Sequence, residues 1–302
     1  MKKTLTILTM MLISFALPGM GQSFSNLWKQ VEEAQEKDLP RTQLDVLGKI
    51  IQKATKEKAY GHLLKAELSS VSVQSSISPD SLMPAFQRLV DKEAKVRTSN
   101  PLLAAVYESA LYQVLDNNYN LSQQFPGKES EYAKLSMRNP ELLAKHKTAE
   151  FTPLFEDGYD SRWFDNDLLS VIGYAAHDYK TMHDYYVQTS NRNAACLTAL
   201  EMAKQHSYGY RVATSEYVRE LDSLINVYGD LKVAGELALA RYKFMENAFD
   251  VSTEEQINYI NYALNRWGSW PRMNILRNEQ KRLTRAGYDV DFGTQVSLPD
   301  RE

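Results

Sequence analysis

The sequence predicts an all-α protein in which antiparallel helix pairs stack as a tetratricopeptide-like solenoid. From residue 24 to about residue 285, apolar residues recur three or four positions apart, which is the spacing of one helix face. In the second half, helix-start signals recur near Glu216, Lys232, Thr253 and Arg272. A period of roughly 34–40 residues per helix pair is typical of such solenoids. No strict repeat consensus is present, so an irregular helical bundle is the alternative.

Residues 22–122 are expected to form the N-terminal helical repeats. Apolar stripes cover Phe24–Val31, Leu44–Ala54 and Tyr60–Val71. Pro40 follows a break between the first two stripes. Proline suits the first turn of a helix because its missing N–H would have no partner there. Three helices are therefore predicted at the start of the chain.

Two further helix starts in this region also place a proline at the first helical position. Ser78-Pro79-Asp80 combines a capping serine, a proline and an acid near the positive end of the helix. Asn100-Pro101 repeats it before another apolar stripe. Helices are predicted to begin at both places.

Residues 123–160 are expected to form an irregular connection that carries short helices. Pro126, Gly127, Pro140 and Pro153 interrupt any long helical stripe there. This segment is also the predicted internal boundary of the chain.

Residues 161–286 are expected to form the C-terminal helical repeats. Their apolar stripes cover Leu168–Ala176, Met182–Val187, Ala194–Lys204, Tyr217–Tyr228 and Val233–Ala248. Ser252 and Glu255 have the spacing of a capping box. Pro271 opens the last predicted helix.

Residues 287–302 show a different pattern. Tyr288, Val290 and Phe292 alternate with polar residues, which is strand spacing. A single strand leaves its backbone groups unpaired. We therefore expect this strand-like tail to lead into a β domain that the sequence does not contain.

The first residues predict export. Residues 1–21 combine a basic start, an apolar run from Leu5 to Leu17 and small residues around Gly21, as in a cleaved secretory signal peptide. No cysteine follows the run, so a soluble, periplasmic protein without a lipid anchor is expected. Loss of Lys2 and Lys3 would change the net charge from −3 to −5. This acidic balance argues against nucleic acid and anionic membranes as partners.

Two groups of residues are candidates for a catalytic or metal site. His177 and His183 lie six positions apart, whereas two metal ligands on one helix face lie three or four apart, so structural or capping roles are expected. The acidic residues Glu156, Asp157, Asp160, Asp165 and Asp167 are expected to form a solvated, helix-capping loop, because a calcium loop would need further oxygen ligands. A glycosidase acid pair among them is the alternative.

Cysteine and aromatic residues are expected to serve packing. Cys196 is the only cysteine, and no histidine base is indicated beside it, so we expect a buried helix residue. The aromatic pairs are more typical of core than of a ligand groove. These pairs are Tyr185 with Tyr186, Tyr208 with Tyr210, and Trp267 with Trp270. No phosphate loop or dinucleotide motif occurs, and no catalytic, cofactor or metal residue is assigned.

Several segments resemble one protein family. Ser25–Ala34, Asp38–Thr42 and Ile50–Ala54 are similar to the start of Bacteroidetes-type alpha-2-macroglobulin-like proteins, and Pro271–Asn278 followed by Leu283-Thr284 is similar to the end of their helical leader. The resemblance implies a helical region that precedes β-sandwich domains in a periplasmic protease trap. The bait and thioester of that family lie downstream, so the resemblance assigns no functional residue here.

The expected function is therefore a non-enzymatic helical-repeat scaffold or interaction module. Its expected partners are downstream β-sandwich domains or another exported protein, with proteases as partners of the full-length protein. A self-standing periplasmic protein that binds peptides or glycans is the alternative from a different class. An all-α glycosidase that uses the acids between Glu156 and Asp167 is the third.

Overall fold

The computed structural model describes residues 22–209, 214–246, 248 and 251–285, and confirms the all-α fold. Within these ranges the chain forms fifteen α-helices and five short 3-10 helices, with no strand. Residues 1–21 and 287–302, where the signal peptide and the strand-like tail are predicted, lie outside the described residues. None of the described helices has both the length and the apolar character needed to cross a bilayer.

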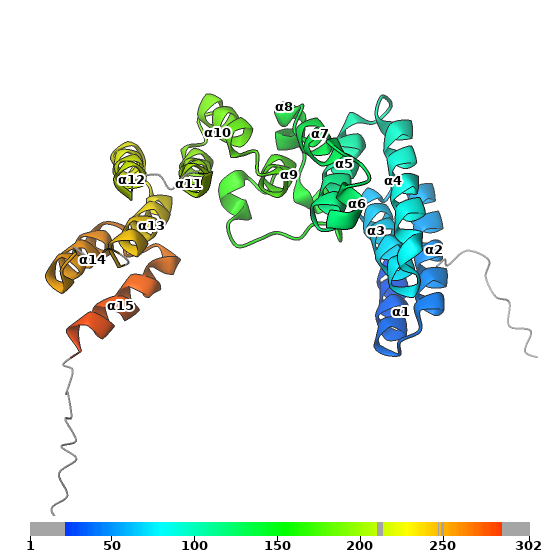
Figure 1. Cartoon of the computed structure of the whole chain (residues 1–302), viewed down its shortest axis with the longest axis horizontal. Helices are drawn as coiled ribbons and strands as arrows, with labels where there is room; N and C mark the ends of the chain where they lie inside the picture. The colour runs from blue at the N-terminus through cyan, green and yellow to red at the C-terminus, as the bar shows by residue number, and fades with distance from the viewer. Residues whose placement is uncertain (1–21, 210–213, 247, 249–250, 286–302) are drawn as a thin grey trace, which may run out of the picture.

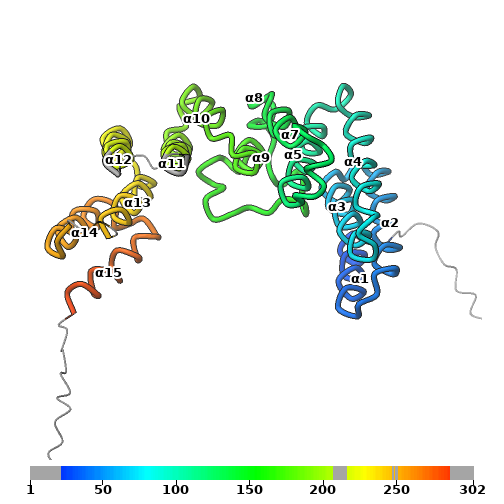
Figure 2. Tube along the Cα trace, viewed as in Figure 1, coloured from blue at the N-terminus to red at the C-terminus, as the bar shows by residue number. Residues whose placement is uncertain are grey.

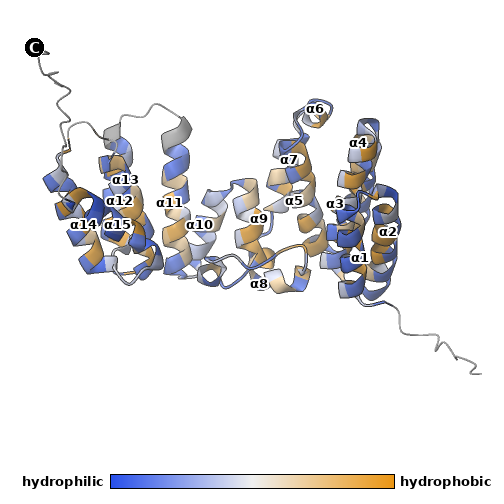
Figure 3. Cartoon of the chain, turned by 90° about the horizontal axis from the view of Figure 1, so that it is seen from below, coloured by the Kyte–Doolittle hydropathy of each residue, from blue (hydrophilic) through white to orange (hydrophobic). Residues whose placement is uncertain are grey.

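The helices stack side by side into an arch (Figure 1). The N-terminal helix α1 and the C-terminal helix α15 lie at opposite ends of this arch (Figure 2). Seen from below, the helices stand in one row along its length (Figure 3). Consecutive helices pack against each other, as in α2 with α3 and α10 with α11. This is the helical-repeat architecture that the apolar periodicity predicts.

Five long helices form the N-terminal part of the arch. They are α1 (Phe24–Glu36), α2 (Pro40–Glu57), α3 (Tyr60–Ile77), α4 (Leu82–Val96) and α5 (Pro101–Asp116). Pro40 and Pro101 occupy the first helical positions, as predicted. The Asn100 side chain accepts a hydrogen bond from the Leu103 N–H at 3.1 Å, so this predicted cap is confirmed.

The helix start predicted at Ser78 is confirmed only for a 3-10 helix and is wrong for the α-helix and for the serine cap. Pro79–Ser81 form the 3-10 helix η1, Ser78 makes no side-chain cap, and α4 begins only at Leu82. Pro84 explains the difference. An α-helix that began at Pro79 would place Pro84 in its interior, where the ring clashes with the carbonyl four residues earlier. With the start at Leu82, Pro84 lies in the tolerated first turn.

The middle of the chain carries short helices, as its prolines predict. They are α6 (Tyr119–Ser122), α7 (Lys128–Ser136), α8 (Pro140–Lys145) and the 3-10 helices η2 (Thr148–Phe151) and η3 (Ser161–Phe164). The segment between η2 and η3 passes below α9 on the inner side of the arch (Figure 1). The division of the repeats into two sets on either side of this region stays a prediction.

The C-terminal part contains seven α-helices and two 3-10 helices. They are α9 (Leu168–Ala176), α10 (Tyr179–Gln188), α11 (Arg192–Gly209), α12 (Thr214–Tyr228), η4 (Lys232–Ala234), α13 (Gly235–Glu246), α14 (Thr253–Trp267), η5 (Pro271–Met273) and α15 (Asn274–Thr284). The capping box of Ser252 and Glu255 is formed, because each side chain bonds the other's backbone N–H. Figure 1 shows α11, α13 and α15 along the inner side of the arch, with α12 and α14 outside.

One apolar cluster runs through most of the arch, from Leu64 in α3 to Leu276 in α15. It includes Phe151 from the central region. A smaller cluster joins α1, α2 and α3 around Leu47 and Ile50. Since each helix pair buries its apolar face against the next pair, burial along the row is the main source of stability.

Candidate functional site

The two histidines singled out in the sequence have structural roles. His177 ends α9 in the left-handed conformation, with φ of 53°, and its Nδ1 lies 3.1 Å from the Tyr179 hydroxyl. His183 Nδ1 lies 3.0 Å from the Ala195 carbonyl oxygen. The described part of the chain contains no group of three or more His, Cys, Asp or Glu side chains placed to hold a metal.

The acidic residues of the central loop do not converge on one site. Glu156, Asp157 and Asp165 are exposed, whereas Asp167 is buried. The Asp157 carboxylate accepts a hydrogen bond from Thr148, and Asp165 Oδ2 accepts one from Asn191 at 3.4 Å. These two carboxylates therefore have separate partners, Thr148 at the start of η2 and Asn191 just before α11.

Asp167 is the N-cap of α9 and is held by hydrogen bonds. Its carboxylate accepts from the Ser170 N–H at 2.8 Å and from the Tyr186 hydroxyl at 2.9 and 3.0 Å. Burial raises the pKa of Asp167 to about 6. The predicted helix-capping role is confirmed at this residue.

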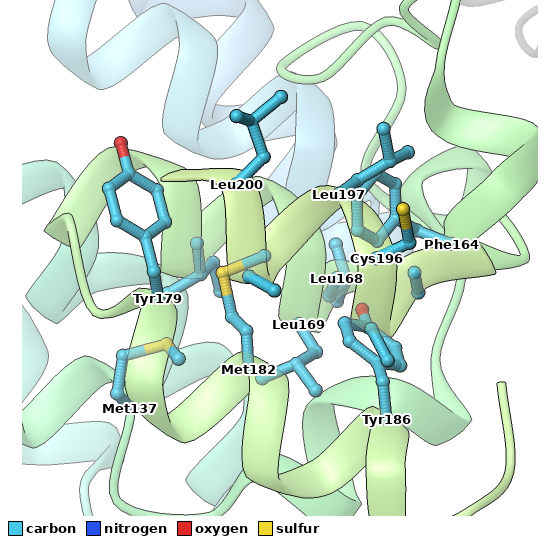
Figure 4. Packing of buried hydrophobic residues seen from close by; sticks show 14 of the residues in the cluster. Met137, Phe164, Leu168, Leu169, Tyr179, Met182, Tyr186, Cys196, Leu197 and Leu200 are labelled. Carbon is cyan, nitrogen blue, oxygen red and sulfur yellow. The ribbon is translucent and has the colours of Figure 1, made fainter. Parts of the chain in front are cut away.

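Cys196 lies inside α11 and is fully buried, within the cluster drawn in Figure 4. Burial raises the pKa of its thiol to about 12. Because the thiolate is the reactive form, a buried thiol with a raised pKa is a poor nucleophile. The predicted role as a buried helix residue is confirmed.

This burial predicts a slow thiol reaction in the folded protein. At pH 8, we expect 5,5′-dithiobis(2-nitrobenzoate) to react with native Cys196 at least about 100-fold more slowly than with the urea-unfolded chain. Absorbance of the released thiolate at 412 nm measures both rates. Equal rates for the folded and unfolded protein would contradict the placement of Cys196 in the core.

The aromatic pairs belong mainly to the core, as predicted. Tyr186, Trp267 and Trp270 are buried, and Tyr185 is partly buried. The two indole N–H groups are satisfied: Trp267 donates to the Gly229 carbonyl at 3.0 Å, and Trp270 donates to Glu236 at 2.7 Å. Residue 210 and the side chain of residue 208 lie outside the described part.

The structure brings together a groove that the sequence analysis missed. A cavity of about 500 Å³ lies among α11, α13 and α15, the helices on the inner side of the arch. Glu236, Ala240 and Lys243 reach it from one face of α13, and Leu200 and Ile275 reach it from α11 and α15. We call this cavity the inner groove. The sequence signal for this groove is the small Ala240, which lies between the longer Glu236 and Lys243 on the same face of α13.

The inner groove carries charges of both signs. It is lined by the basic residues Lys204, Lys243 and Arg272 and by the acids Glu236, Glu246 and Glu279. Arg272 pairs with Glu236 at 2.9 Å, although the arginine side chain stays half exposed. A hydrogen bond from Arg282 holds the pKa of Glu279 below its ordinary value. The groove is therefore balanced in charge and combines polar groups with an apolar wall.

Comparisons with protein-family models, with curated proteins and with solved structures gave no match to this chain.

Proposed function

We propose that the protein is a non-enzymatic helical-repeat module whose inner groove binds a polypeptide segment of a partner. The observation that carries the proposal is the groove itself, which is lined by α11, α13 and α15, the helices that Figure 1 shows along the inner side of the arch. Stacked helical repeats create extended concave surfaces of the kind used for binding. The mixed polar and apolar lining complements a peptide, which presents apolar side chains and backbone hydrogen-bonding groups together.

The chemically reactive residues considered above are buried or hydrogen-bonded to neighbouring groups, which supports a role without catalysis. Cys196 is buried with a raised pKa, and Asp167 is occupied by Ser170 and Tyr186. The two histidines are bonded to neighbouring groups. The glycosidase alternative placed its acid pair between Glu156 and Asp167, and these acids do not converge on one site. The partner classes that we propose are the β-sandwich domains of a larger protein or another exported protein, following the resemblance of the helical segments.

Filling the inner groove should weaken peptide binding. We expect an array of twelve-residue peptides to retain the wild-type chain on members that combine an apolar side chain with charges of both signs. In Ala240→Leu, three added carbon atoms occupy the groove from a partly exposed position, so retention should fall at least about tenfold, or about 1.4 kcal/mol.

Ala110→Leu is the matched control, since Ala110 is also partly exposed but lines a different cavity. It should retain peptides as the wild type does. Circular dichroism checks that both variants are folded. No retention by the wild type, or equal retention by Ala240→Leu, would contradict the proposal. A glycan array run in parallel tests the alternative function. Glycan binding that is lost in Ala240→Leu would indicate that the inner groove binds a sugar instead of a polypeptide.

A further inference from the structure

A second cavity, separate from the inner groove, lies where α3, α5 and α9 meet the segment after η2. Its volume is about 430 Å³, within the range of small-molecule sites. Leu68, Val106 and Val171 supply apolar wall from the three helices, and Leu154 and Phe155 supply it from the segment. We call it the α3–α5–α9 pocket. None of the residues that line it is ionisable.

Ser109 of α5 gives this pocket a buried polar group without a partner. The residue is 6% exposed and lines the pocket. Among the residues that the structure describes, none forms a hydrogen bond with its hydroxyl. The hydroxyl oxygen itself stays accessible, so a ligand in the pocket that offers a hydrogen-bonding group can pair with it.

Three amide side chains line the same pocket and offer acceptors. Gln113 donates its Nε2 to the Ala175 carbonyl at 3.1 Å, Asn117 donates Nδ2 to the Gln113 carbonyl at 2.8 Å, and Asn118 donates Nδ2 to the Val114 carbonyl at 2.7 Å. Because a carbonyl can only accept, the NH₂ group must be the donor in each bond. Each amide can then offer a ligand its side-chain oxygen as an acceptor and the second N–H of its NH₂ group as a donor.

We infer that the α3–α5–α9 pocket binds a neutral, mostly apolar small molecule that carries an N–H or O–H donor. The apolar wall accommodates the body of such a molecule. Ser109 and the amide oxygens accept its hydrogen bonds. A charged ligand would lose its hydration without gaining a counter-charge, since no ionisable side chain lines the pocket.

Two fluorescent probes with the same aromatic skeleton test this inference. N-phenyl-1-naphthylamine is neutral and carries one N–H donor, and 8-anilino-1-naphthalenesulfonate adds a sulfonate to it. We expect the neutral probe to bind the full chain saturably at one site. The sulfonate should bind at least about tenfold more weakly, because its charge would be buried unpaired.

Two variants locate the site. Ala110→Leu fills the pocket and should weaken binding of the neutral probe at least about tenfold. Ser109→Ala adds no volume, so it tests the hydroxyl even if Ala110→Leu fails to fold, and it should weaken binding about fivefold. Ala240→Leu, in the inner groove, should leave probe binding unchanged. Absence of saturable binding, equal binding of the sulfonate, or unchanged binding by Ser109→Ala would overturn the inference.

Discussion

Gly61→Ala is expected to lower the free energy of unfolding by at least about 2 kcal/mol, because the added methyl group has no space. A Cβ at Gly61 would lie 2.2 Å from the Phe151 carbonyl oxygen and 2.4 Å from that of Thr152. Backbone cannot rotate aside as a side chain can. The Phe151 carbonyl also accepts the Leu154 N–H at 2.8 Å, and the Phe151 ring is buried, so this segment is fixed against α3.

Gly48→Ala is the matched control. Gly48 lies in the interior of α2, and a Cβ there would meet nothing within 4 Å. Alanine is the better helix former, so this variant should be more stable by about 0.5–1 kcal/mol. Urea unfolding followed by circular dichroism at 222 nm measures both. If Gly61→Ala were as stable as the wild type, the close approach of Phe151 and Thr152 to α3 would be wrong.

Glu108→Gln is expected to stabilise the protein at pH 8 by about 2–3 kcal/mol and to lose that advantage at pH 4.5. Glu108 of α5 is fully buried, and burial raises its pKa to about 7. Arg138 donates to its Oε1 at 3.0 Å, and its Oε2 accepts no hydrogen bond in the described structure. The nearby Glu93, also fully buried, raises this pKa further and is itself bonded by Arg97 at 2.6 and 2.8 Å.

The direction of this pH dependence follows from the number of protons that the folded and unfolded states bind. The folded state holds the Glu108 proton up to about pH 7, whereas the unfolded state releases it near the ordinary value of 4.5. The folded state therefore binds more protons between these values, and stability falls as the pH rises through that window. Glutamine has the same shape and stays neutral, so the variant lacks this loss.

Urea unfolding at pH 4.5 and pH 8 measures the Glu108 effect as the change in the stability difference between variant and wild type. Asp167 also has a raised pKa, but it is present in both proteins and cancels. Glu131→Gln is the control, because Glu131 is half exposed on α7 and bonds Lys128. It should change stability by only a few tenths of a kcal/mol at either pH. An equal difference for Glu108→Gln at both pH values would show that Glu108 is not held protonated in the core.

The fold was predictable where the signals are local. The spacing of apolar residues predicted the helices. Asn100 and Ser252 predicted helix starts, because a cap depends on only four adjacent residues. The start at Ser78 failed because Pro84, six residues later, decides where the α-helix can begin. The contact of Gly61 with Phe151 joins residues far apart in the chain, and helical periodicity carries no information about it.

The candidate sites were less predictable for the same reason. The inner groove depends on α11, α13 and α15 lying on one side of the arch, and the sequence does not specify its curvature. Sequence spacing did predict structural roles for His177 and His183, whose ring nitrogens lie beside the Tyr179 hydroxyl and the Ala195 carbonyl. Ser109 was not singled out, because a serine in an apolar helix becomes informative only when its hydroxyl is found to line a cavity without a hydrogen-bond partner.

The most direct test of the proposed function is a calorimetric titration of the best-retained array peptide into the wild type, Ala240→Leu and Ala110→Leu. We predict binding of one peptide per chain, with a dissociation constant at least about tenfold higher in Ala240→Leu and unchanged in Ala110→Leu. Mass spectrometry of the peptide after the titration should find it intact. Equal affinity for the wild type and Ala240→Leu, or a cleaved peptide, would contradict a non-enzymatic module that binds its partner in the inner groove.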